Sequence, residues 1–196
     1  MLGKLFSKSA PANPPQEVRL HIRLNARLQP VQRGNLFEDP LDQALRAENL
    51  GQVVGGGTLM ADDPDGMTAC EIEVMLHHDS DDTVERIIAF LDQTGAPVGS
   101  TLMRAGHGPV PFGLWQGMAV FLNTTDLPDA VYADFDINDT IAGLVQALSG
   151  LAEFRGHWQG YSLYFYGPDY AQMSAAAAAF AATDPLCGQC RIEQIA

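Results

Sequence analysis

Cysteine is scarce in this sequence, which holds only Cys70, Cys187 and Cys190 among its 196 residues. Three cysteines are too few for a secreted scaffold held together by disulfides, and a chain of this length can bury a core without them. The sequence therefore favours a reducing compartment, and we expect the protein in the cytoplasm.

Long apolar runs are absent as well. None approaches the roughly 18 residues that a membrane-spanning helix needs, and the short basic start of the chain is followed by prolines at positions 11, 14 and 15. Eight residues with few apolar side chains would hold a membrane surface only weakly. We expect no signal peptide and no membrane span, and we interpret residues 1–15 as a frayed N-terminal tail.

Basic residues are few: 11 lysines and arginines face 24 aspartates and glutamates, for a net charge of −13. Six of the basic residues lie before residue 34, which leaves 5 basic and 23 acidic residues in 34–196, a formal charge of −18. Such a body repels phosphate backbones, so nucleic acid is not an expected partner. A basic protein is the partner that this charge favours.

Alternation of apolar and polar side chains marks the first strand, where Leu20, Ile22 and Leu24 alternate with charged neighbours. Turn, cap and periodicity signals then divide the next eighty residues. They predict a helix that begins at Asp39-Pro40 and ends near Gly51, strands over 52–60 and 70–77, a helix capped by Asp79 or Asp81, and a strand over 100–103. The order is βαββαβ.

A second series of the same signals follows a segment rich in glycine and proline, residues 105–115. It predicts a strand over 116–123, a helix that begins at Asp136 or Asn138, a strand region over 157–166, a helix over 171–182 preceded by Asp169, and a closing strand over 190–195. The two halves also align at nearly constant offsets, so that Ile22 meets Val120 and Phe37 meets Phe135.

The repeated order predicts an α+β protein made of two tandem, duplicated ferredoxin-like units with antiparallel sheets. We place the first unit at 16–104, the linker at 105–115 and the second unit at 116–196. In each unit two helices would cover one face of the sheet and leave the other face free.

The free faces of the two units differ in character. In the first, Arg19 and Arg23 should pair across strands with Glu71 and Glu73. In the second, the aligned positions are apolar, and something must cover them: the linker with Phe112 and Trp115, the other unit, a second copy of the chain in a homodimer, or a protein partner. The residues concerned are Ala119, Phe121, Leu163 and Phe165, and of these Phe121, Leu163 and Phe165 are candidates for partner binding.

Two clusters carry side chains of chemical interest. His77 and His78 precede a turn rich in aspartate, but neighbouring residues on a strand point to opposite faces and the aspartates suit helix capping, so we predict no metal site there. Cys187 and Cys190 have the spacing of a redox or zinc pair. No second pair accompanies them, and the pair follows a helix instead of opening one, so ordinary packing explains both.

Motifs of known catalytic families are missing: the sequence has no nucleophile elbow, no zinc-protease motif and no nucleotide-binding loop. The run Gly55-Gly56-Gly57 lacks the lysine of a phosphate loop and is better explained by a bulge or a close backbone approach. We predict no catalytic residue, no cofactor and no metal.

Two hypotheses of function stay open. The first is a non-catalytic, acidic binding protein of the inhibitor or immunity type with a basic partner. The alternative is an enzyme or small-ligand sensor whose pocket lies between the two units, lined by His107, Trp115, His157 and Tyr161.

Overall fold

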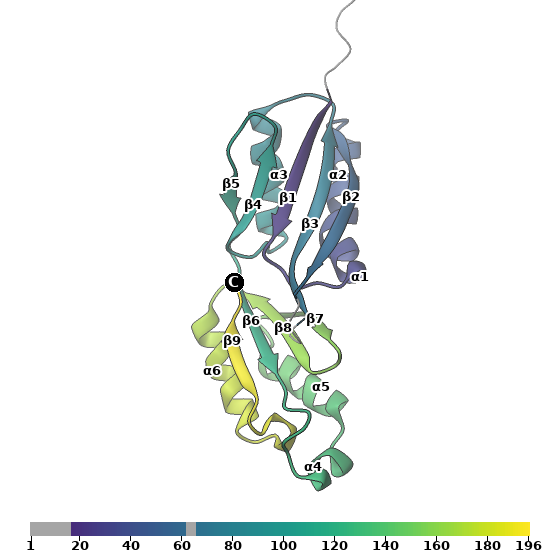
Figure 1. The fold of residues 1–196 in the computed structure, drawn as a ribbon. Coiled ribbons are helices and arrows are strands. Elements are labelled where there is room, and N and C mark those ends of the chain that lie inside the picture. Colours follow the sequence, from purple (N-terminus) through teal and green to yellow (C-terminus); the bar gives the residue numbers. More distant parts are fainter. Residues whose placement is uncertain (1–16, 62–65) are drawn as a thin grey trace, which may run out of the picture.

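The computed structural model describes residues 17–61 and 66–196 (Figure 1). These residues form two antiparallel sheets with helices packed on them, which makes the protein a member of the α+β class. The first sheet has the strand order β2-β3-β1-β4-β5 and the second the order β7-β8-β6-β9. The tail predicted over residues 1–15 lies outside the described residues.

The elements follow one another in two similar series. The N-terminal half contains β1 (Val18–Leu24), α1 (Pro30–Arg33), the π-helical turn η1 (Gly34–Glu38), α2 (Asp39–Ala47), β2 (Gly51–Met60), β3 (Met67–Leu76), α3 (Asp81–Gln93), β4 (Ser100–Arg104) and β5 (Val110–Phe112). The C-terminal half contains β6 (Gln116–Phe121), α4 (Asp129–Asp134), α5 (Ile137–Ala147), β7 (Glu153–Trp158), β8 (Ser162–Gly167), α6 (Tyr170–Ala181), the 3₁₀ turn η2 (Pro185–Cys187) and β9 (Arg191–Gln194). Strand β5 lies inside the segment expected to be a linker and extends the first sheet instead.

The first helix begins at Pro30, well before the Asp39-Pro40 start that the sequence predicts. The chain stays helical through Asp39, which is therefore not an N-cap. Pro40 has no N–H and cannot donate to the preceding turn. The π-helical turn just before it, where the Asp39 N–H bonds the carbonyl of Gly34, lets the helix continue past this proline.

Helix caps are predicted better in the C-terminal half than in the N-terminal half. Asp136 caps α5 and Asp169 caps α6, as expected. Helix α3, however, is capped by Ser80, whose hydroxyl accepts from the Thr83 N–H. The two aspartates proposed for that role bind Arg104 instead.

The glycine run of β2 allows a close approach between the strand and the helix above it. A Cβ on Gly56 would overlap the Glu38 carboxylate. Glu38 holds that position because Arg33 Nε donates to it at 2.8 Å, and the same guanidinium donates to Thr58 at 2.7 Å. The run is therefore a packing device, as the sequence indicated.

The open face of the first sheet carries charged side chains, and one of the two predicted cross-strand pairs forms an ion pair. Arg19 forms an ion pair with Glu73 at 3.1 Å, and Arg23 lies directly opposite Glu71 in the β1–β3 register. His21 Nε2 lies 3.4 Å from the same Glu71 carboxylate. These side chains are partly exposed, so this face of the sheet is in contact with water.

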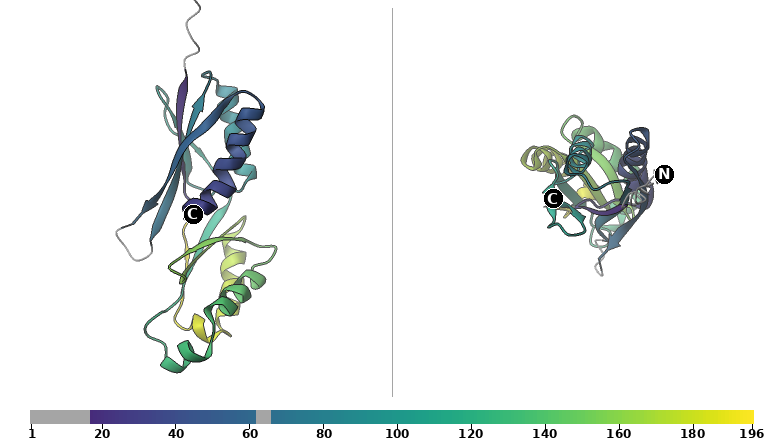
Figure 2. Two further views of the ribbon diagram at one scale, coloured as in Figure 1. Left: turned by 90° about the vertical axis from the view of Figure 1, so that its right-hand side faces the viewer. Right: turned by 90° about the horizontal axis from the view of Figure 1, so that it is seen from above.

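The two halves lie end to end, with the helices on the same side of both sheets (Figures 1 and 2). The β2–β3 hairpin extends beyond β1 towards the second sheet. At its tip the backbone of Gly66 lies against Trp158 of β7, so close that a Cβ there would overlap the indole.

The face of the second sheet that points away from the helices is here called the outer face. Its side chains Ala119, Phe121, Tyr164 and Tyr166 belong to the same apolar cluster as the core of the N-terminal half. Arg27 of the N-terminal half lies 5.7 Å from the centroid of the Tyr164 ring, and Arg191 of β9 lies 4.6 Å from that of Phe121. Phe121 is only 6% exposed, as its predicted burial requires, so side chains of the chain itself bury this face.

The strand β8 differs from the prediction by one residue in register. Phe165 lies opposite Met118 and Leu163 opposite Val120, so both point to the helices, and both are fully buried. The outer face carries Tyr164 and its neighbours instead. Because β8 is apolar on both faces, the alternation of its side chains does not reveal which set faces the helices. Leu163 and Phe165 therefore offer no surface to a partner.

Arg155 joins the two halves. Its guanidinium donates to the carbonyls of Thr94 and Gly95, both at 2.8 Å, at the C-terminal end of α3. It also lies over the indole of Trp115, 4.5 Å from the ring centroid, and pairs with Glu153. Burial lowers its pKa, which the Glu153 charge opposes. The cation thus satisfies helix-end carbonyls that would otherwise be buried without donors.

We expect Arg155→Ala to lower the free energy of unfolding by about 3 kcal/mol, because it leaves two carbonyls without donors in a buried junction. Urea denaturation measures the loss. Arg46→Ala is the matched control: its exposed pair with Asp42 should contribute less than about 0.5 kcal/mol. Equal losses in the two variants would show that Arg155 does not hold the junction.

Candidate functional site

The four residues predicted to line a pocket between the units do not meet. Trp115 is covered by Arg155, and His157 borders a groove on β7. Tyr161 lies in the β7–β8 turn, where its hydroxyl bonds Gln159. His107 lies in the β4–β5 turn, close enough to Asp81 to lower the pKa of that carboxyl, after the larger effect of Arg104. The four predicted residues therefore belong to three regions: the surroundings of Arg155, the β7–β8 turn and the β4–β5 turn.

The groove beside His157 lies between the two halves and has a volume of about 500 Å³. It is bordered by Gln32 and Asn35 on the N-terminal half and by β7 on the other. The side-chain oxygen of Gln32 is buried there without a hydrogen-bond partner. Its one buried cation, Arg155, is already committed to the end of α3.

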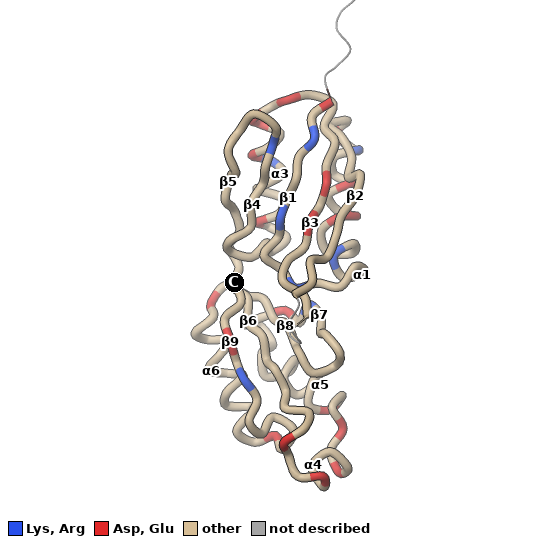
Figure 3. Tube along the Cα trace, viewed as in Figure 1, with Lys and Arg blue, Asp and Glu red and all other residues tan. Residues whose placement is uncertain are grey.

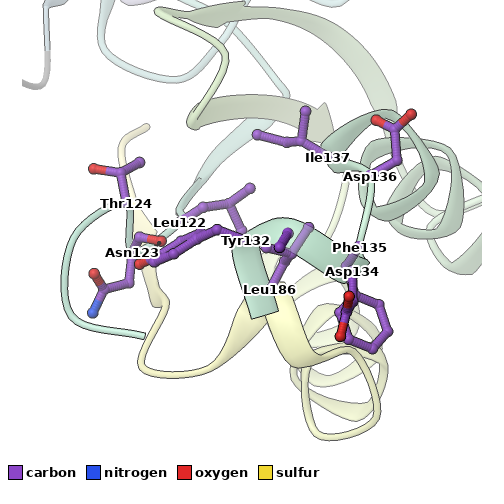
Figure 4. Close-up of a pocket in the computed structure, with 10 residues that line it drawn as sticks. Leu122, Asn123, Thr124, Tyr132, Asp134, Phe135, Asp136, Ile137 and Leu186 are labelled. Carbon is purple, nitrogen blue, oxygen red and sulfur yellow. Dashed lines mark hydrogen bonds between the residues drawn. The ribbon is translucent and has the colours of Figure 1, made fainter. Parts of the chain in front are cut away.

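A second cavity of about 500 Å³ lies at the far end of the C-terminal half, away from the junction (Figure 4). The end of β6, the loop after it, α4, the start of α5 and the turn η2 surround it. Its lining residues are Leu122, Asn123, Thr124, Tyr132, Ala133, Asp134, Phe135, Asp136, Ile137 and Leu186. We call it the end cavity.

Hydrogen bonds fix the walls of the end cavity. The Tyr132 hydroxyl accepts from the Leu127 N–H at 3.0 Å and donates to the carbonyl of Asn123, which ties α4 to the loop after β6. Asp136 accepts from the backbone N–H of Asn138 and so starts α5. Three of the lining residues, Asn123, Tyr132 and Asp136, are therefore held in place by hydrogen bonds.

The end cavity is negatively charged. Asp134 and Asp136 line it, and the whole segment 105–154 contains neither lysine nor arginine. Figure 3 shows acidic positions at α4 and the adjacent end of α5 with no basic position beside them. Phe135 is 47% exposed at its edge. The site can hold a group that is both cationic and partly apolar.

None of the residues that line this site is among the predicted site residues. One signal for it was present in the sequence, the absence of lysine and arginine from 105–154. The exposure of Phe135 was not visible in the sequence, because Phe37, at the position predicted to align with it, is fully buried.

Among residues 17–61 and 66–196, no group of three or more His, Cys, Asp or Glu is arranged to hold an ion. Asp79 and Asp81, beside His77 and His78, are bound to Arg104. In the same described part of the chain no helix is both long and apolar enough to cross a membrane.

No protein-family model and no curated protein matches the sequence. A crystal structure of an unknown protein from Galdieria sulphuraria matches at 10% identity, covering 91% of this chain and 98% of that one, with a TM-score of 0.29. A heme-binding protein from Thermus thermophilus matches at 11% identity over 90% and 87%, with a TM-score of 0.29. The regulatory subunit of aspartate kinase from the same organism matches at 14% identity over 83% and 91%, with a TM-score of 0.26. Likenesses this weak carry no argument about function.

Phe121 and Phe135 should respond differently to the same substitution. Phe121→Ala should cost about 3–5 kcal/mol of unfolding free energy, because it opens a cavity in the buried outer face of the second sheet. Phe135→Ala should cost less than about 1 kcal/mol, because that ring is half exposed. Urea denaturation of both variants tests this. A large loss in Phe135→Ala would mean that the edge of the end cavity is part of the core.

Proposed function

We propose that this chain is a non-catalytic binding protein, of the inhibitor or immunity type, and that a basic protein partner inserts a cationic side chain into the end cavity. The observation that carries the proposal is the combination of Asp134 and Asp136 with a half-exposed Phe135 around one hollow. The formal charge of −18 over residues 34–196 favours encounter with a basic partner over long range.

The chemistry of the cavity suits lysine and arginine. Both carry an apolar stem and a charged head, and the stem packs on apolar walls while the head meets a carboxylate. Here Leu122, Ile137 and Leu186 supply the walls, and Tyr132 and Phe135 supply rings for a cation. Charge complementarity of this kind sets which partner binds and how fast.

The fold that we propose for this function is a pair of diverged ferredoxin-like units, with boundaries near 16–104 and 116–196. Support comes from the strand orders, because the first four strands of each half occupy the same places in their sheets. The three free thiols suit a reducing cytoplasm, the compartment that we propose.

A small-ligand sensor is the second candidate, and the groove between the halves favours it. Asn35 and His157 are polar borders of this groove, and the side-chain oxygen of Gln32 beside them is buried without a hydrogen-bond partner. Nothing in the groove supplies a nucleophile held by a base, so this candidate binds without catalysis.

The end cavity should prefer a basic peptide. We expect a short peptide with one arginine among apolar residues to shift the backbone NMR signals of Phe135 and Ile137, and a peptide with glutamate in its place to leave them unchanged. Asp134→Asn should weaken the basic peptide about tenfold, which corresponds to about 1.4 kcal/mol. Raising the salt concentration should weaken it too.

Glu85→Gln is the matched control, since it removes the same charge from an exposed position on α3 in the other half. It should leave the affinity within about twofold of the parent protein. Signals that move around Gln32 and His157 instead would favour the groove. Equal binding of both peptides, or equal loss in both variants, would refute recognition by the end cavity.

A further inference from the structure

A β-turn brings Cys187 and Cys190 close together. The Cys190 N–H donates to the carbonyl of Cys187 at 3.0 Å, which closes a four-residue β-turn. Such turns bring their first and last Cα atoms within about 7 Å, a range that overlaps the spacing of disulfide-bonded cysteines. Both cysteines are free thiols in this structure.

The backbone of this turn is strained. Gly188 has φ −54° and ψ 126°, and Gln189 has φ +58°, the combination of a type II turn. Position three of that turn favours glycine, but here it holds glutamine. The glycine stands one place earlier, where a Cβ would lie 2.9 Å from Leu127. A side chain held at positive φ is strained, and such positions gather at functional sites.

The two thiols have different surroundings. Cys187 is buried, while Cys190 is partly exposed. The hydrogen bond from Cys187 lowers the pKa of Cys190 to about 7. The pKa of Cys187 is raised, first by the same bond and then by burial, and the nearby Asp184 carboxylate adds to this. This division gives one accessible thiolate and one covered resolving thiol, the pattern of redox-active pairs.

We infer that Cys187 and Cys190 form a redox site that closes to an intramolecular disulfide by exchange with a small-molecule disulfide such as oxidised glutathione. This chemistry does not require partner binding at the end cavity, although Leu186, which lines that cavity, directly precedes Cys187. It differs from a thioredoxin-like centre because the pair follows the turn η2 and leads into β9, instead of opening a long helix.

The exchange takes two steps. The Cys190 thiolate attacks one sulfur of oxidised glutathione, the glutathione disulfide breaks, and one glutathione leaves as thiolate. Cys187 then loses its proton and attacks the Cys190 sulfur of the mixed disulfide, which releases the second glutathione. Two protein thiols are oxidised, one small disulfide is reduced to two thiols, and the two protons of the cysteines end on the released glutathiones.

Oxidised glutathione is the probe, and Cys70 is the internal control because it is buried and burial raises its pKa. We expect the reduced full-length chain to lose the mass of two hydrogens, with Cys187 and Cys190 protected from alkylation and Cys70 still free after unfolding. In the native protein at pH 7, iodoacetamide should modify Cys190 at least about tenfold faster than Cys70.

Two variants separate the steps. Cys187→Ser should stop at a mixed disulfide on Cys190, seen as one added glutathione. Cys190→Ser should add none, because the remaining thiols are buried. Near-UV circular dichroism before the assay confirms that each variant is folded. A parent protein that keeps both thiols free, forms a disulfide between chains, or accumulates only the mixed disulfide would overturn the inference.

Discussion

Burial of the outer face of the second sheet is the constraint on which the rest of the molecule depends. When helices cover one face of a four-stranded sheet, the other face is either exposed to water or buried by another part of the protein. Here β6 and β8 place Phe121 and Tyr164 on that side, so it cannot stay in water. Arg27 of the N-terminal half lies over Tyr164, and Arg155 supplies donors to the end of α3 at the same junction. One apolar cluster therefore continues from the N-terminal half onto the outer face of the second sheet, while a second cluster fills the space between that sheet and its helices.

This arrangement leaves the two sheets with different surfaces. The first keeps a wet face of paired charges such as Arg19 and Glu73, with no aromatic platform on it. In the second sheet the corresponding outer face is apolar and buried. The surfaces left for recognition in the C-terminal half are therefore the ends of its strands and helices, where the end cavity lies.

Much of the fold was within reach of the sequence, and the failures have physical causes. The βαββαβ order, the charge pairs of the first sheet and the caps at Asp136 and Asp169 follow from local rules. The register of β8 does not, because a strand that is apolar on both faces carries no signal of direction. The start of the first helix was hidden by Pro40, which marks a helix beginning in most contexts but here follows a π-helical turn.

The candidate site was the least predictable part, because it depends on distant segments meeting. Leu186 of η2 reaches the cavity only because β9 returns beside β6 and brings the preceding turn next to α5, where Asp184 accepts from Thr140. That hydrogen bond also holds the segment before Cys187, whose backbone N–H points to the same carboxylate. One aspartate thus organises both the floor of the end cavity and the entry to the strained turn. The sequence around Asp184 does not indicate either role. The bond with Thr140 joins segments far apart in the chain, and the bond with the Cys187 N–H lies within a turn that forms only when β9 pairs with β6.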